Sequence, residues 1–298
     1  MSVRSLNKSR PTGVLQITVH GSQGVLFTLI MILERIIYYP IKSLRGIEVG
    51  SHQATPMGLH WDRRWMLIEG DGSFVSQRKD PKLAQLLVEK TTHGWLVSAP
   101  EGHAVTVPFE CQTGHGVGVE VWGDQFEAIH GPSHADGFFS SFLDRPVRLV
   151  YHHNPTGRPV DPRYSKGDSH VAFADGYPYL VLSTASIRFC QSQSPEETVD
   201  WRRFRPNLVV SSDQPFEEDS WLAIQIGEAV FELVKPCARC VMITVDPETG
   251  MGGSPLLKAL SNSRLQEKGI MVGQNALLHQ PATLNIGDSV TVLRKDLS

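Results

Sequence analysis

Short apolar runs bounded by glycine, proline or aspartate recur along most of the chain. Runs of about four to eight residues rich in β-branched and aromatic side chains are typical of β-strands. In the first half this pattern predicts a strand from Leu33 into a proline-broken loop, and a hairpin of 61–69 with 74–78. Further strands are predicted at 95–98, 104–108, 118–122 and 147–151. So many short strands at close spacing predict a small barrel or sandwich.

Sequence signals for helices are fewer than those for strands. Asp80-Pro81 has the form of an N-cap followed by a first-turn proline, so we predict a helix over 82–90 and a second one over 135–143. Residues 154–168 are rich in turn formers and lack apolar periodicity, which places a domain boundary there. Beyond it we predict strands at 179–183, 207–211, 221–226 and 229–234, a strand pair within 282–293, and helices from Ser186 and after Ser254-Pro255.

The predicted fold class is therefore mainly β with some helices (α+β), in two domains at 31–153 and 154–298. Residues 1–30 are expected to be a disordered extension. Their apolar stretch, 24–33, is far shorter than the roughly 20 residues that a spanning helix needs, so no clear membrane span is predicted. Basic residues precede this stretch, so a signal or transit peptide stays open as an alternative.

Composition narrows the classes of function. A net charge of -3 argues against nucleic-acid binding and against a polybasic membrane surface. Basic residues bunch locally, at Arg63-Arg64 and around Arg202, which suits an anionic small molecule. Four cysteines in 298 residues are too few for a secreted disulfide framework. We therefore expect a reducing compartment and a cytoplasmic location, with mitochondrial targeting as the alternative.

The stretch around Cys237-Ala-Arg-Cys240 is the main candidate for chemistry. Two β-branched runs flank it, which predicts strand, tight corner and second strand, with Arg239 placed to favour an ionised sulfur. Pattern alone leaves four readings open: a zinc site, a thioredoxin-like pair, two buried structural thiols, or one thiolate ligand to a soft metal. His152 and His153 are adjacent on a predicted strand and point to opposite faces, so we read them as surface residues.

The chain resembles the MOSC proteins in the form that carries an N-terminal MOSC β-barrel domain, and is most similar to the mitochondrial amidoxime-reducing components and their bacterial relatives. The resemblance runs in order from about Met31 to the C-terminus. The motifs that carry it are Tyr39-Pro-Ile-Lys-Ser-Leu-Arg-Gly46, Gly58-Leu59, Asp62-Arg-Arg-Trp65, Arg78 with Asp80-Pro81, Asp175-Gly-Tyr-Pro178, Leu180-Val-Leu-Ser183, Phe204-Arg-Pro-Asn207, Glu218-Asp-Ser-Trp221, Cys237-Ala-Arg-Cys240, Thr244-Val-Asp-Pro-Glu-Thr-Gly250, Gly273-Gln274 and Ile286-Gly-Asp288.

This resemblance implies a β-barrel-like first domain packed on a β-barrel MOSC domain, and it implies the molybdenum cofactor, a pterin dithiolene with a phosphate. It also implies that the molybdenum takes Cys240 as a protein ligand, with Asp175 near the reacting centre to orient the pterin or relay protons. Gln77 and Arg78 either line the substrate mouth or lie on an exposed hairpin face. By motif position the cofactor-binding residues are Lys42, Ser43, Arg63, Tyr177, Arg205, Asn207 and Arg239.

The activity that the resemblance implies is reduction of N-oxygenated small molecules, such as amidoximes and N-hydroxylated bases, by a molybdenum-dependent oxidoreductase. It implies an external electron donor, namely a reductase, a ferredoxin or a cytochrome b5-like protein. Two alternatives use the same pocket. One is sulfur transfer as in molybdenum cofactor sulfurases, with a pyridoxal-phosphate enzyme as the sulfur donor. The other is a non-catalytic cofactor carrier.

Overall fold

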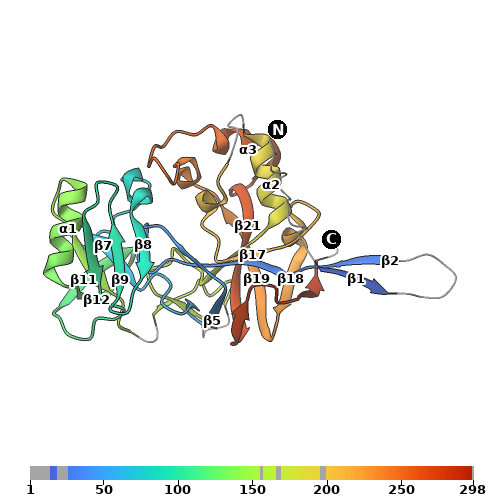
Figure 1. The fold of residues 1–298 in the computed structure, drawn as a ribbon, viewed down its shortest axis with the longest axis horizontal. Helices are drawn as coiled ribbons and strands as arrows, with labels where there is room; N and C mark the ends of the chain where they lie inside the picture. The colour runs from blue at the N-terminus through green and yellow to red at the C-terminus, as the bar shows by residue number, and fades with distance from the viewer. Residues whose placement is uncertain (1–13, 19–25, 155–156, 166–168, 195–198, 297–298) are drawn as a thin grey trace, which may run out of the picture.

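The computed structural model describes residues 14–18, 26–154, 157–165, 169–194 and 199–296. Strands dominate, and the predicted class, mainly β with some helices, is confirmed. Two bodies of secondary structure lie side by side in Figure 1, with strands of the first half on the left and a larger sheet on the right. No helix in the described ranges is both long enough and apolar enough to cross a membrane.

The first body consists of two small antiparallel sheets and one helix. One sheet has the order β11-β12-β13-β7 and the other β10-β9-β8. Along β11 buried and exposed residues alternate strictly, as expected for a strand with one face on the core. The bounds are β7 Trp65–Ile68, β8 Leu87–Lys90, β9 Trp95–Ser98, β10 Ala104–Val107, β11 Gly116–Val121, β12 Asp124–His130, α1 Ser133–Leu143 and β13 Arg148–Tyr151.

The second body is a nine-stranded sheet with the order β23-β18-β19-β21-β16-β17-β3-β4, to which β20 adds by pairing with β21. Helices α2 and α3 contact each other, and α2 follows β16 directly. The bounds are β3 Leu33–Tyr38, β4 Ile47–Val49, β16 Tyr179–Ser183, α2 Thr184–Gln193, β17 Leu208–Val210, β18 Trp221–Ile226, β19 Ala229–Ala238, α3 Leu256–Arg264, β20 Leu265–Gln266, β21 Gly269–Gln280 and β23 Val290–Lys295.

Short elements join the two bodies. The three-stranded sheet β22-β5-β6 pairs a C-terminal strand with two strands of the first half. One core cluster runs through both bodies, from Leu33 and Trp65 to Phe231 and Val290. The two bodies are therefore packed on each other. The remaining bounds are β5 Ser51–Thr55, β6 Gly58–Leu59, β14 Arg158–Pro159, β15 His170–Val171 and β22 Thr283–Asn285, with 3₁₀ helices η1 Pro81–Gln85, η2 Trp201–Phe204, η3 Glu217–Ser220 and η4 Val241–Thr244.

One strand at the start of the first predicted domain pairs with the second half of the chain. The first domain is predicted to begin at residue 31, and β3 pairs with β17 and with β4 in the nine-stranded sheet. Leu33, Ile36 and Ile37 are almost fully buried, so β3 needs partners on both sides. A strand of the first half thus completes the sheet of the second, which brings the loop after β3 to the junction of the two bodies.

Three predicted elements are wrong. The helix predicted over 82–90 is only one turn, η1, because Leu86 takes an extended backbone and the chain continues as β8. The second strand predicted after the cysteines is the 3₁₀ helix η4. The strands predicted to pair within 282–293 separate, since β22 pairs with β5 and β23 with β18.

The extension before residue 31 was expected to be disordered, and the structure describes two strands in it. Strand β1 (Val14–Thr18) pairs antiparallel with β2 (Leu26–Ile30). Antiparallel pairing satisfies the backbone donors and acceptors on the facing edges of both segments. In Figure 1 this hairpin extends away from the body on the right. The rest of the predicted extension, 1–13 and 19–25, lies outside the described residues.

Candidate functional site

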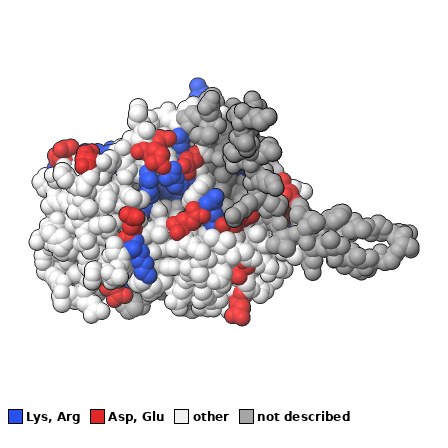
Figure 2. Space-filling model, in the orientation of Figure 1, with Lys and Arg blue, Asp and Glu red and all other residues white. Residues whose placement is uncertain are grey.

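A polar pocket lies where the loop after β3, the segment before β16 and the end of β19 converge. All nine residues that the sequence nominated as site residues line it: Lys42, Ser43, Arg63, Asp175, Tyr177, Arg205, Asn207, Arg239 and Cys240. Its other lining residues include Arg78, Cys237 and Asn275. Figure 2 shows Lys and Arg side chains gathered with Asp and Glu near the junction of the two bodies, on an otherwise mostly uncharged face.

One wall of the pocket is a charged group that we call the pocket cluster: Lys42, Arg78 and Asp175. Lys42 donates its Nζ to the Phe173 carbonyl at 2.7 Å and forms an ion pair with Asp175. Arg78 Nη2 lies 2.9 Å from the other Asp175 oxygen. Each carboxylate oxygen therefore accepts from a different cation, one on either side.

The pocket cluster perturbs its own ionisation. Burial lowers the pKa of Lys42 to about 8, although Asp175 opposes this shift. Burial alone would raise the pKa of Asp175, but Lys42 and Arg78 hold it well below its usual range. Asp175 thus stays ionised near neutral pH. Of the two roles predicted for it, orientation fits this environment and proton relay does not.

A second wall stacks two guanidinium groups on one aromatic ring. The guanidinium carbons of Arg63 and Arg205 lie 4.4 and 4.3 Å from the ring centroid of Tyr39. Arg63 pairs with the Asp62 carboxylate and reaches Asn207 Oδ1 at 3.3 Å. The face of Tyr39 thus holds two cations together, because the electron-rich ring face attracts cations.

Arg205 is the cation of this wall that lacks a carboxylate partner. It donates to the Leu44 carbonyl at 2.8 Å. Within the ranges that the structure describes, no carboxylate lies within ion-pair distance of it. Burial lowers the pKa of Arg205 to about 10, which still leaves it charged at neutral pH. A buried positive charge without a negative partner favours an anionic ligand.

Backbone strain concentrates at the pocket. Ser43, Arg63 and Arg205 all have positive φ, at 70°, 50° and 53°. This conformation is uncommon for residues other than glycine, and strained residues cluster at functional sites. The folded structure therefore imposes an unfavourable backbone at three of the nominated cofactor-binding positions.

The two cysteines lie at the end of β19 and just after it, and both thiols are free and half-buried. Arg239 was expected to lie beside a sulfur of this corner, and its Nη1 lies 3.1 Å from Cys237 Sγ, while its Nη2 donates to the Phe204 carbonyl at 2.7 Å. Arg78 interacts electrostatically with Cys240. Burial alone would lower the pKa of Arg78, but Asp175 and Cys240 raise it.

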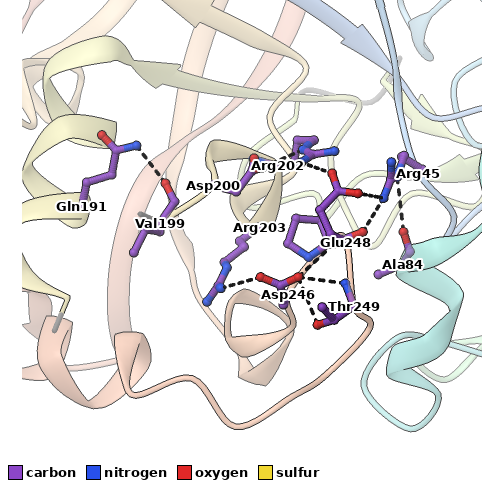
Figure 3. Close-up of polar contacts among 11 residues, drawn as sticks. Arg45, Ala84, Gln191, Val199, Asp200, Arg202, Arg203, Asp246, Glu248 and Thr249 are labelled. Atoms are coloured by element: carbon purple, nitrogen blue, oxygen red, sulfur yellow. Dashed lines mark hydrogen bonds and ion pairs between the residues drawn. The ribbon is translucent and has the colours of Figure 1, made fainter. Parts of the chain in front are cut away.

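The loop that follows Cys240 is held by a second charged group, which we call the loop clamp: Arg45, Arg202 and Glu248. Glu248 forms ion pairs with Arg45 at 3.2 Å and with Arg202 at 2.5 Å (Figure 3). The neighbouring Asp246 accepts from the backbone of the loop itself and pairs with Arg203 at 3.1 Å. The clamp joins the first half of the chain, through Arg45, to the loop that carries the thiol.

Two pattern-based readings of polar residues need correction. Gln77 is only 5% exposed and donates to the Ser43 carbonyl at 2.6 Å, while Arg78 lines the pocket, so neither lies on an exposed hairpin face. His152 is 1% exposed rather than a surface residue, and burial lowers its pKa to about 4. It packs against Phe126 and Phe173. No motif marks these burials, because they depend on contacts between residues far apart in the sequence.

The residues of the pocket fit an anionic cofactor with a soft metal. The Tyr177 hydroxyl and the Nε of Arg239 are buried without a hydrogen-bond partner in the described part of the chain. These two donors, the uncompensated Arg205 and a free thiol line one pocket. Thiolate sulfur is a donor for soft metals, and fixed cations and amide groups bind phosphate. The described residues contain no group of three or more His, Cys, Asp or Glu side chains placed to bind a metal ion.

Comparison with known proteins agrees with this arrangement. Residues 30–146 match the MOSC N-terminal beta barrel domain and residues 168–291 match the MOSC domain. The chain is 33% identical to human mitochondrial amidoxime-reducing component 1 over 86% of its own length and 81% of that protein. It is 32% identical to the mouse protein of the same name, over 86% of this chain and 80% of the mouse protein.

A second kind of relative is larger. The chain is 30% identical to the molybdenum cofactor sulfurase of Danio rerio over 78% of its own length, which is 30% of the sulfurase. The order of the two matched domains, together with the identity to full-length relatives, decides the assignment. The chain belongs to the family of MOSC proteins that carry an N-terminal MOSC β-barrel domain before the MOSC domain, the family of the mitochondrial amidoxime-reducing components.

Proposed function

We propose that this protein binds the molybdenum cofactor and, with it, reduces N-oxygenated compounds such as amidoximes. The observation that carries the proposal is that the Cys240 thiol shares one pocket with Lys42, Arg63 and Arg205, which come from both halves of the chain. The names of the human and mouse relatives, which are amidoxime-reducing components, support the same reaction.

The residues of the pocket divide into three roles. Cys240 would supply the protein sulfur to the metal, and Cys237, engaged by Arg239, would be its structural companion. Arg63, Arg205 and Lys42 would hold the anionic tail of the cofactor, with Ser43 beside them. Tyr177 and Arg239 would offer hydrogen bonds to the pterin, because each has a donor to spare. The Asn207 amide already donates to the Ile37 carbonyl and to Asp62, so it would hold Arg63 and the pocket wall in place.

The overall reaction takes an amidoxime, two electrons and two protons to an amidine and water. When bound, the molybdenum centre supplies the two-electron reduction of the N–O bond. The side chains of the protein position the reacting groups and stabilise their charges. The Asp175 carboxylate stays ionised and fixes Lys42 and Arg78 in the pocket. The Lys42 Nζ, whose pKa is about 8, is the group of the pocket cluster that can hold a proton near neutral pH and exchange it.

The proposed reduction needs a source of two electrons. We propose a separate donor, a reductase, a ferredoxin or a cytochrome b5-like protein, because the sequence has four cysteines and two of them already belong to the pocket. An iron–sulfur cluster held by cysteines alone needs four.

Turnover of benzamidoxime with a supplied reductant tests the proposal. Molybdenum-loaded wild-type protein should form benzamidine, and Cys240→Ala should lose both bound molybdenum and turnover. Cys237→Ala is the matched control and should keep most of its molybdenum. If loaded wild-type protein produces no benzamidine while Cys240→Ala still binds the cofactor normally, both the activity and the ligand are wrong.

Sulfur transfer is the second candidate, favoured by the presence of Cys237 beside Cys240 and by the sulfurase relative. A sulfur carrier needs a thiol to hold the transferred sulfur, and the guanidinium of Arg239 beside Cys237 would stabilise its anionic form. Mass spectrometry after incubation with a cysteine desulfurase and cysteine separates the two functions. A gain of one sulfur atom on Cys237 supports transfer, whereas amidoxime turnover by Cys237→Ala supports reduction.

A further inference from the structure

Trp122 is an exposed tryptophan beside the pocket, on the side of the first body. It is 54% exposed, whereas the other five tryptophans are buried or half-buried. Exposing an indole forgoes the burial that usually stabilises so large an apolar side chain. Nothing in the core of the first body requires a tryptophan at this position.

The backbone at Trp122 is unfavourable as well. β11 and β12 are joined by the two residues Trp122 and Gly123, with φ of 56° and 90°. A two-residue turn with positive φ at both central residues favours Asn, Asp or Gly at the first of them. A bulky residue there costs about 1–2 kcal/mol relative to its usual conformation. The turn therefore carries a residue that its conformation disfavours, in a structure whose other positive-φ residues include Ser43, Arg63 and Arg205 of the pocket.

The neighbours of the Trp122 indole connect it to the Cys240 thiol. The Arg78 guanidinium carbon lies 4.7 Å from the centroid of the Trp122 ring, and Phe74 packs against it at 5.3 Å with an interplanar angle of 61°. Arg78 in turn pairs with Asp175 and interacts electrostatically with Cys240. The indole thus stands one residue away from the reacting centre of the proposed site.

A buried arginine fixes the turn to the pocket. Arg158 Nη1 donates to the Val121 carbonyl at 3.3 Å and pairs with Asp124 at 2.6 Å, so it holds both residues that flank the turn. The same guanidinium donates to the carbonyls of Ala172 and Ala174, directly before Asp175. The position of Trp122 relative to the pocket is therefore set by the fold and not by a free loop.

We propose that Trp122 is a specificity-determining residue: its indole is the platform on which the aromatic ring of an aryl N-oxygenated substrate stacks, while the N–O group enters the pocket. This inference rests on the proposed reductase function. Offset stacking of two aromatic rings contributes about 0.5–1.5 kcal/mol beyond area burial. A small molecule is favoured over a protein partner, because the indole lies against Arg78, whose side chain lines the pocket that would take the N–O group.

The decisive variant is Trp122→Asn, because asparagine suits the turn while it removes the indole. Molybdenum-loaded protein should keep its melting temperature and molybdenum content. Its KM for benzamidoxime should rise about tenfold and its KM for hydroxylamine, which has no ring to stack, should change by less than about twofold. The Kd of benzamidoxime, measured by calorimetry without a reductant, should rise in parallel. Trp122→Phe should retain most of the affinity, and Leu265→Ala, exposed elsewhere, should change nothing.

Three outcomes would overturn the inference. Unchanged KM and Kd for benzamidoxime in Trp122→Asn would exclude a platform. Equal losses for benzamidoxime and hydroxylamine would mean that Trp122 acts only through Arg78. A change confined to the dependence on donor-protein concentration would make Trp122 a docking residue for that donor. Failure of the proposed reductase function would give a different result. Wild-type protein would then turn over neither compound, while the difference in benzamidoxime Kd between wild-type protein and Trp122→Asn would still report stacking.

Discussion

The pocket cluster and the loop clamp are each built from one carboxylate and two cations but differ in burial. Both tie the first half of the chain to the second through a carboxylate between two cations. The side chains of Lys42 and Arg78 are 6% and 21% exposed, against 19% and 29% for Arg45 and Arg202. The carboxylates are 50% exposed in Asp175 and 61% in Glu248, so the main difference is the burial of Lys42. Charge pairs in water contribute little to stability, while a buried charge that loses its partner is costly. The pocket cluster should therefore control stability and ligand binding, and the clamp should only fasten a loop.

The largest effect is expected from Asp175→Ala. It leaves the Lys42 ammonium buried with the Phe173 carbonyl as its remaining partner. Breaking a buried pair costs about 3–5 kcal/mol, and half of the Asp175 side chain is exposed, so we expect a loss of about 2 kcal/mol. Chemical denaturation at pH 7, on protein of matched molybdenum content, measures it. The double variant that combines Asp175→Ala with Lys42→Met should recover more than half of the lost stability. A loss below about 0.5 kcal/mol in Asp175→Ala would show that the pocket cluster contributes no more to stability than the loop clamp.

The next effect concerns the backbone of the clamped loop rather than its charges. Gly250 has φ +66°, and a Cβ there would lie 2.9 Å from Lys82 Cα. Gly250→Ala should therefore lower the free energy of unfolding by about 1–2 kcal/mol. Gly252 has no positive φ, and the nearest atom to its Cβ would be Pro81 Cγ at 3.9 Å, so Gly252→Ala is the matched control. Equal losses in the two variants would contradict this explanation.

The pH dependence of sulfate binding tests the ionisation of Lys42 in the pocket cluster. Because burial lowers the pKa of Lys42 to about 8, this positive charge is present at pH 7 and is lost as the pH rises through 8. Sulfate keeps its charge over this range, so its affinity for cofactor-free protein should fall about tenfold between pH 7 and pH 9. Lys42→Arg should bind sulfate almost independently of pH. An identical pH profile in the two proteins would rule out Lys42 as the cause.

The smallest effect is expected in the loop clamp. Glu248→Gln removes two ion pairs, but the exposure of Glu248 limits each to a few tenths of a kcal/mol. We expect a loss of about 0.5 kcal/mol that disappears in 1 M NaCl, where charges are screened within about 3 Å. Denaturation at low and high salt measures this difference. A salt-independent loss above about 1.5 kcal/mol, or a drop in molybdenum content, would show that the clamp does more than fasten the loop.

The sequence located the pocket better than it predicted the elements around it. Short motifs in the right order nominated nine residues that line one pocket, because each motif contributes a side chain to the same junction. Local patterns failed where long-range pairing decides. Nothing in Leu33–Tyr38 shows that this strand joins the sheet of the second half. The β-branched run after Cys240 reads as a strand, but the structure forms a single 3₁₀ turn there.

Contacts across the junction were equally invisible in the sequence. The motif places Arg239 beside both cysteines, but only the folded structure shows that it engages Cys237 and that Arg78 interacts with Cys240. Trp122 reads as the end of a strand in the apolar pattern. Its left-handed turn and its stacking on Arg78 depend on packing between segments more than 40 residues apart.

The central claim is that the sulfur of Cys240, and not that of Cys237, binds the metal in a pocket of cations from both halves of the chain. X-ray absorption at the molybdenum edge tests it directly, by counting sulfur neighbours of the metal in wild-type protein, Cys240→Ser and Cys237→Ser. Cys240→Ser should show one sulfur neighbour fewer than wild-type protein, and Cys237→Ser should show an unchanged count. An unchanged count in Cys240→Ser, or a sulfur lost only in Cys237→Ser, would contradict it.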